Sequence, residues 1–139
     1  MKGKHCLFLL LILGALLACN DPKPVTETLH RAEALMNEHP DSAWAVLNTL
    51  SPDEMGQNRT RALYALLYSQ AQDKTYRDET NDSLISIAGD YYRHTVDTRR
   101  KFLSYYYKGR VMRNARESMK AMLSFLEAEN LSEEINDGY

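Results

Sequence analysis

The chain has 139 residues, with 17 lysines and arginines against 19 aspartates and glutamates, and its net charge at neutral pH is −2. This slight acidic excess argues against a protein that binds nucleic acid over its whole surface. Two cysteines are also too few for a disulfide framework or a cysteine-based zinc site.

The first 18 residues have the features of a secretory signal. Lys2 and Lys4 precede an unbroken run of apolar residues and glycine that extends from Leu7 to Ala18. A membrane-spanning helix needs about 20 apolar residues, so this run is too short to cross a bilayer comfortably. A basic start, a short apolar region and small residues at its end instead predict a signal peptide over residues 1–18.

Cys19 follows directly and completes the string LLAC, which resembles a bacterial lipobox. The resemblance implies that Cys19 receives a diacylglyceryl group, carries palmitate among its acyl chains and becomes the mature N-terminus. Residues 19–24 would then be the lipidated cysteine and a short tether, which two prolines keep extended. Cleavage would also remove Cys6 and raise the net negative charge to −4. An uncleaved anchor, or an ordinary signal with a chance cysteine, stays open as an alternative.

Residues 25–139 are expected to form one helical domain. Apolar residues recur at helical spacing in six stretches, which predict helices over 25–38, 42–50, 58–72, 82–95, 98–113 and 116–134. Pro40, with Asp41 or Ser42 after it, is a helix start signal. No stretch alternates convincingly with a period of two, so the predicted fold class is all-α.

Small and aromatic residues recur at fixed intervals in the last two predicted helices. The first of these helices carries Tyr105, Gly109 and Met112, and the second carries Ala121, Phe125 and Ala128. This is the spacing of a tetratricopeptide repeat, in which glycine and alanine sit where two helices approach closely and aromatic rings fill the gaps.

The same register extends towards the N-terminus. Tyr91 lies 34 residues before Phe125, and Ala65 lies 44 residues before Gly109 once the polar connection of residues 73–82 is allowed for. We therefore predict a tetratricopeptide-like α-solenoid of about three antiparallel helix pairs. Lys108 departs from the repeat pattern, and a generic bundle of α-hairpins stays open as the alternative.

Three segments carry a resemblance to a known group: ALYALLYSQAQDKTY, NDSLISIAGDYY and YYYKGRVMRNARESMKAMLSFLEAENL. They resemble the N-terminal part of tetratricopeptide-repeat lipoproteins and membrane-anchored regulators of Gram-negative bacteria. The resemblance implies a protein-interaction scaffold in the cell envelope, with the outer membrane favoured. Members of that group usually continue with further repeats and sometimes with a DNA-binding or signalling domain, so we expect this chain to be a short or truncated member.

No pattern for catalysis or cofactor binding is found. The sequence lacks a glycine-rich phosphate loop, a nucleophile elbow and a paired-histidine zinc motif. The acidic connection of residues 73–82 lacks the alternating oxygen ligands and central glycine of a calcium loop. We therefore expect no enzyme activity, no catalytic residue, no cofactor and no metal.

Positive charge concentrates between residues 93 and 116, where eight lysines and arginines accompany one acid, Asp97. The resemblance implies that the first helix of each pair lines a concave face. On that helix Tyr106, Arg110 and Arg113 form one stripe, which predicts a peptide-binding groove for an acidic peptide or a C-terminal carboxylate. The alternative is a solvated helix whose arginines pair with carboxylates of neighbouring helices.

These observations together predict a membrane-anchored lipoprotein whose solenoid is a protein–protein interaction scaffold. Two alternatives stay open. One is the sensory, membrane-proximal part of a signal-transduction regulator. The other is a nutrient-binding helical lipoprotein, which would be expected to expose several tryptophans, whereas this chain has only Trp44. The expected partners are a protein or acidic peptide and, through the lipid, the membrane, without nucleic acid. We also expect self-association through the last helix pair, because its second helix has more apolar residues than one buried stripe needs, namely Met119, Met122, Leu123, Phe125, Leu126 and Leu131.

Overall fold

A computed structural model describes residues 23–137, which fold into six α-helices and one short 3₁₀-helix without a strand. The helices are α2 (Lys23–Leu35), α3 (Pro40–Leu47), η1 (Pro52–Glu54), α4 (Asn58–Lys74), α5 (Ser83–Tyr92), α6 (Thr98–Asn114) and α7 (Ser118–Asp137). The predicted all-α class is confirmed, and every α-helix begins and ends within three residues of its predicted limits. No helix among the described residues is long and apolar enough to cross a membrane. The predicted signal peptide and Cys19 lie outside the described residues.

The helix ends follow from local sequence. Pro40 occupies the first turn of α3, where its fixed φ and missing N–H suit a helix start. Asp97 caps α6, because its Oδ1 accepts a hydrogen bond from the backbone N–H of Arg100 at 2.9 Å. α4 and α6 both stop where a residue adopts a positive φ, namely 57° at Tyr76 and 62° at Arg116.

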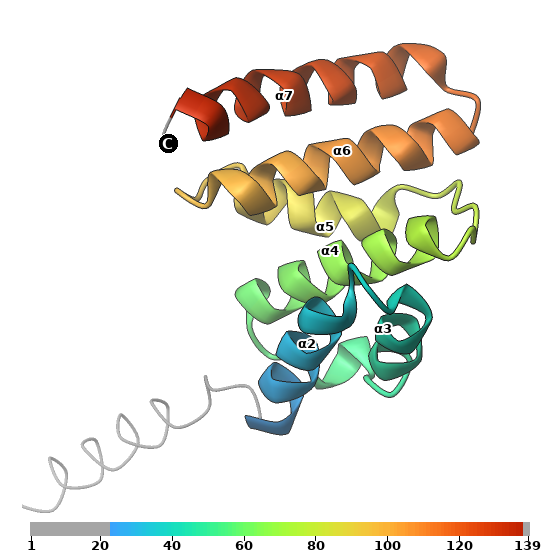
Figure 1. The fold of residues 1–139 in the computed structure, drawn as a ribbon, viewed down its shortest axis with the longest axis vertical. Coiled ribbons are helices and arrows are strands. Elements are labelled where there is room, and N and C mark those ends of the chain that lie inside the picture. The colour runs from blue at the N-terminus through green and yellow to red at the C-terminus, as the bar shows by residue number, and fades with distance from the viewer. Residues whose placement is uncertain (1–22, 138–139) are drawn as a thin grey trace, which may run out of the picture.

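The helices stack along the longest axis of the molecule in chain order (Figure 1). Helices that are neighbours in the chain pack together, and α4 also packs against both α2 and α6. The first helices of the three hairpins α2–α3, α4–α5 and α6–α7 are therefore in contact one after another. In Figure 1, α2 and α3 lie at one end of the stack and α7 lies at the other.

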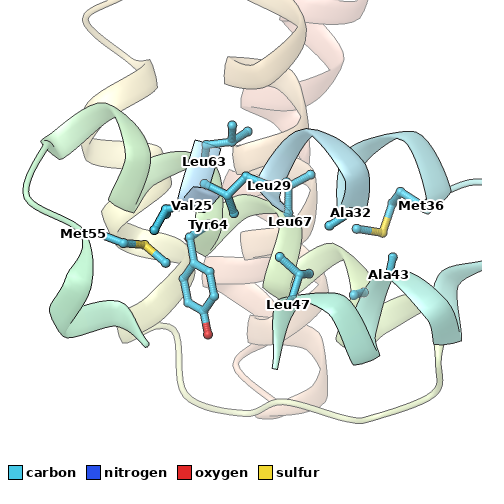
Figure 2. Packing of buried hydrophobic residues seen from close by; sticks show 11 residues of the cluster. Val25, Leu29, Ala32, Met36, Ala43, Leu47, Met55, Leu63, Tyr64 and Leu67 are labelled. Carbon is cyan, nitrogen blue, oxygen red and sulfur yellow. The ribbon is translucent and has the colours of Figure 1, made fainter. Parts of the chain in front are cut away.

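Two apolar clusters join the hairpins, and α4 contributes to both. Figure 2 shows the first cluster, which joins α2, α3 and α4 and includes Val25, Leu29, Ala32, Met36, Ala43, Leu47, Met55, Leu63, Tyr64 and Leu67. The second joins α4, α5 and α6 through Ala62, Ala65, Leu66, Ile85, Ala88, Tyr92, Tyr107 and Val111. Because its opposite faces serve different clusters, α4 is buried over most of its circumference and is the central element of the fold.

Gly109 allows the side chain of Phe125 on α7 to lie against the backbone of α6. A Cβ atom added at Gly109 would meet ring atoms of Phe125 at 2.5, 2.7 and 2.9 Å, closer than real Cβ contacts come. Ala121 and Ala128, on α7, are buried. The predicted role of a small residue at this helix contact is therefore confirmed for Gly109.

Candidate functional site

The three residues of the predicted stripe have different surroundings. Arg110 already has a partner within the protein, because its Nε donates a hydrogen bond to Oδ1 of Asp73 on α4 at 2.6 Å. This hydrogen bond raises the pKa of Arg110. The ring of Tyr106 lies 5.9 Å from that of Phe125, at the junction of α6 and α7. Arg113 is exposed and lines a pocket beside α7. The structure therefore leaves Tyr106 and Arg113 accessible and gives Arg110 a carboxylate partner.

Ion pairs with carboxylates neutralise much of the positive charge between residues 93 and 116. Four of its cations form ion pairs: Arg93 with Asp90, Arg100 with Glu33 and Asp97, Lys108 with Asp82, and Arg110 with Asp73. Three of these four reach a carboxylate on another helix or in a connection outside their own helix. The alternative of arginines that pair with neighbouring helices therefore describes Arg100 and Arg110, whereas Arg99, Arg113 and Arg116 are exposed.

Two neighbouring cavities are lined by residues from the first helices of all three hairpins. One, of about 530 Å³, lies beside the first half of α2 and the other, of about 300 Å³, lies beside its last turn, and Asp97 and Arg100 line both. Residues of α4 and α6 also line both cavities, and Tyr91 and Tyr92 of α5 line the larger one. We call these two cavities together the inner groove.

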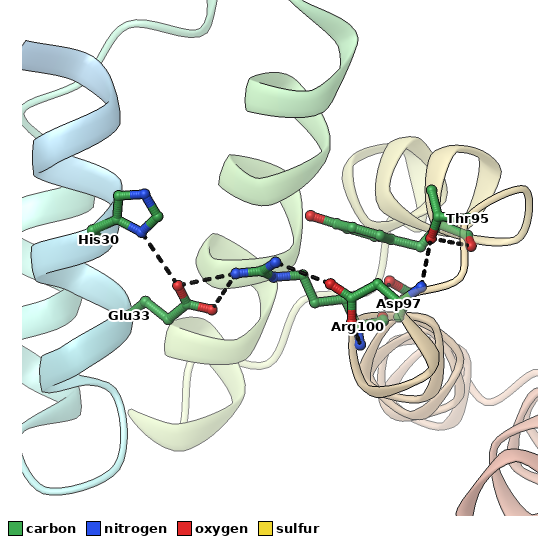
Figure 3. A network of polar contacts seen from close by, with 7 residues as sticks. His30, Glu33, Thr95, Asp97 and Arg100 are labelled. Atoms are coloured by element: carbon green, nitrogen blue, oxygen red, sulfur yellow. Dashed lines mark hydrogen bonds and ion pairs between the residues drawn. The ribbon is translucent and has the colours of Figure 1, made fainter. Parts of the chain in front are cut away.

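A polar bridge spans the inner groove (Figure 3). Nη2 of Arg100 donates to Oε1 and Oε2 of Glu33 at 2.9 and 3.2 Å, and Nη1 donates to Oδ2 of Asp97 at 3.0 Å. Nδ1 of His30 lies 3.6 Å from Oε2 of Glu33. Glu33 belongs to α2 and Arg100 to α6, so the bridge links the first hairpin to the third, across α4.

Positive charge exceeds negative charge in the inner groove. Its walls carry Lys23, Arg59, Arg99 and Arg100 against the carboxylates of Glu33 and Asp97. Both carboxylates already bind Arg100, whereas Lys23, Arg59 and Arg99 are exposed. A surface of this kind favours a ligand that carries a carboxylate.

Aromatic and apolar groups complete the wall of the larger cavity. The rings of Tyr91 and Tyr92 meet edge to face at a centroid distance of 5.2 Å. Burial raises the pKa of Tyr92 to about 12, so its phenol is neutral at physiological pH. Val96, in the connection between α5 and α6, is fully exposed at the edge of the cavity. The inner groove therefore offers an apolar contact beside its cations.

Sequence reasoning did not identify the inner groove. Its charged residues come from three stretches that are far apart in the sequence: Lys23 and Glu33 from α2, Arg59 from α4, and Arg99 and Arg100 from α6. The excess of cations over acids near Arg100 is the one signal that pointed to this part of the chain.

The outer face of α7 is a second unusual surface. Met119, Met122, Leu123 and Leu126 are 74, 56, 56 and 47 % exposed, so the predicted excess of apolar residues is confirmed for these four. Leu131 is only 9 % exposed, so it is buried and does not belong to this exposed face. A shallow pocket of about 340 Å³ between Arg113 and Glu129 borders this face.

Among the side chains that the structure describes, no group of three histidine, cysteine, aspartate or glutamate residues is placed to bind a metal ion. Comparisons with protein-family models, with curated proteins and with solved structures find no match to this chain. The resemblance to tetratricopeptide-repeat lipoproteins accordingly rests on the three segments of sequence given above, within residues 62–131.

Proposed function

We propose that the protein is a membrane-anchored lipoprotein whose helical domain is a tetratricopeptide-like solenoid and serves as a protein–protein interaction scaffold. The inner groove is its binding site, and an acidic segment of a partner protein is the ligand. One observation carries this proposal: α4 packs between α2 and α6, and these three helices line a groove that contains more cationic than carboxylate side chains.

The packing order of the helices supports a solenoid. In a solenoid the hairpins stack one after another, and the first helices of successive hairpins line one face. Here α4 contacts α2 on one side and α6 on the other, while α3 and α5 lie between successive first helices in the chain. A bundle around a single core would not require α4 to serve two separate clusters.

The size and chemistry of the inner groove support a short peptide ligand. Pockets that enclose small ligands occupy about 300–1,000 Å³, which corresponds to a few side chains of a peptide. The two cavities have volumes of about 530 and 300 Å³. Arg59 and Arg99 can each donate two parallel hydrogen bonds to a carboxylate, as guanidinium groups do in acidic-motif recognition.

Tyr106, Arg110 and Arg113 stay a second predicted contact for the same acidic segment. Arg110 would then have to share its guanidinium with Asp73, which already binds Nε. The inner groove needs no such exchange, because Arg59 and Arg99 are exposed. It is therefore the stronger of the two positions.

A displayed library of random peptides tests the groove. We expect enrichment of acidic peptides, and a loss of at least about tenfold in their affinity when Arg59→Glu and Arg99→Glu are combined, equivalent to about 1.4 kcal/mol. Arg31→Glu is the matched control, because Arg31 is an exposed cation of α2 that does not line the groove. Enrichment without acidic residues, or equal binding by the groove variant, would contradict the proposed ligand.

Radiolabelled palmitate tests the anchor. The native chain should incorporate the label and Cys19→Ser should not, because the proposed lipid is attached through the sulfur of Cys19. Equal labelling of both chains would refute lipidation at Cys19.

A further inference from the structure

The four exposed apolar residues of α7 form one stripe. Met119, Met122, Leu123 and Leu126 are separated by three, one and three residues, so they share one face of the helix over about two turns. At 74, 56, 56 and 47 % exposure they leave an apolar surface open to solvent at one end of the stack (Figure 1). Contiguous exposed apolar surface of this kind marks interaction sites.

The spacing of apolar residues along the stripe is the same in both directions of the helix. Its centre lies between Met122 and Leu123, with Met119 and Leu126 equally far on either side. A second α7 laid antiparallel on the first would therefore place Met122 against Leu123 and Met119 against Leu126. This self-complementary pattern is what a two-fold symmetric interface requires, because the same patch must serve both copies.

Charge along the bordering pocket favours the antiparallel direction. Arg113 lies at the end of the pocket beside the start of α7, and Glu129 lies beside its later turns. An antiparallel partner brings its own Glu129 towards Arg113, and the reciprocal contact forms at the other end. A parallel partner would instead bring Arg113 towards Arg113 and Glu129 towards Glu129, which is repulsive.

We propose that two copies of this chain associate through α7, antiparallel, with Met122 and Leu123 at the two-fold axis and Arg113 of each copy facing Glu129 of the other. Two helical turns extend over only about 10 Å, so the interface is smaller than the roughly 800 Å² per partner of a stable complex. The dimer is therefore weak, with a dissociation constant in the micromolar range or above. It leaves the inner groove free, because none of the groove's lining residues belongs to α7.

Site-specific disulfide formation in the full chain tests the geometry. Met119→Cys and Leu126→Cys are made singly, one chain is labelled with a heavy isotope, the two are mixed and oxidised, and linked peptides are identified by mass spectrometry. We expect links between residues 119 and 126 of different copies, and few links of either position to itself. Leu123→Cys should link to itself because it lies next to the axis. Ile87→Cys, at an exposed apolar residue of α5, should not link.

Charge exchange tests the polar contacts independently. Arg113→Glu and Glu129→Arg should each reduce the yield of the 119–126 link at least about fivefold, and the combined exchange should restore it, because each swapped residue again faces its opposite charge. Leu123→Glu should abolish the link while circular dichroism and peptide binding in the inner groove stay unchanged. Links of 119 to 119 and 126 to 126, absence of links at all three positions of α7, or occupation of α7 by a different protein would overturn the proposal.

Discussion

The contact between Gly109 and Phe125 gives the sharpest prediction of how this fold is held together. Gly109 and Gly89 are both helical glycines, on α6 and α5. A Cβ atom at Gly109 would meet the Phe125 ring at 2.5 Å, whereas a Cβ atom at Gly89 would meet nothing within 4 Å. The same substitution, glycine to alanine, should therefore be less favourable for stability at Gly109 than at Gly89.

The expected magnitudes follow from two terms. Alanine stabilises a helix interior by about 1 kcal/mol relative to glycine, and this gain is common to both positions. Overpacking typically costs about 1–3 kcal/mol, and it applies only to Gly109→Ala. Gly89→Ala should thus raise the free energy of unfolding by up to about 1 kcal/mol, and Gly109→Ala should lie about 1–3 kcal/mol below it.

Urea unfolding followed by far-ultraviolet circular dichroism measures both variants. Phe125→Leu in combination with Gly109→Ala isolates the steric term, because the ring that causes the clash is then absent and the double-mutant cycle should show a favourable coupling of about 1 kcal/mol or more. Equal stability changes at the two glycines, or no coupling to Phe125, would refute the close approach of α7 to α6.

Three further predictions concern charges and pH. Hydrogen bonds from backbone N–H groups, above all that of Asn81, lower the pKa of Glu79 below its ordinary value of 4.5. Ionised Glu79 therefore stabilises the fold above pH 4.5, and this stabilisation is lost as the pH falls through the lowered pKa. Glu79→Gln should reduce this loss of stability, as measured by urea titrations at each pH. Burial raises the pKa of Tyr64, Tyr92 and Tyr107 to about 12. Because these phenols ionise near pH 10 in the unfolded chain, the free energy of unfolding should fall as the pH rises from 10 to 12. Phenolate absorbance should show that these tyrosines ionise only as the protein unfolds. Glu33→Gln and Arg100→Gln should show a coupling of only about 1 kcal/mol in a double-mutant cycle, because both side chains are partly exposed, and high salt should reduce it.

Helix positions were predictable where a helix buries one stripe of apolar residues, because that stripe repeats at the period of the helix. α4 is the exception, since it is buried over most of its circumference. The ends were less predictable where apolar periodicity continues into a turn. Met36 continues the apolar periodicity of α2 and is buried, so the predicted helix included it. In the structure α2 ends one residue earlier, at Leu35. Pro40 also disfavours helical geometry at the residue before it.

The candidate site was less predictable than the fold, because its contacts join residues that are far apart in the sequence. Periodicity placed Tyr106, Arg110 and Arg113 on one helix, but it contains no information about which element faces each of them. Arg110 meets Asp73 from 37 residues away, and Arg100 meets Glu33 from 67 residues away. A count of cations in one segment therefore overstated the positive charge that remains available.

α4 and α6 resemble each other most clearly at their ends, where sequence spacing was least informative. α4 and α6 begin at Asn58 and Thr98, and their left-handed residues are Tyr76 and Arg116, so both features recur after 40 residues. The residue after each left-handed position donates its N–H to the carbonyl five residues earlier, at 2.9 Å in both cases. The sequence register related Gly109 to Ala65 at 44 residues instead, because it counted small residues at a helix contact.

The two spacings differ because different interactions determine them. Helix ends depend on local backbone hydrogen bonds, whereas the place of a small residue depends on where the partner helix crosses. The partner helices are unequal, since α5 has 10 residues and α7 has 20. The repeated helix ends therefore relate α4–α5 to α6–α7, and the differences between these two hairpins lie in their second helices and connections.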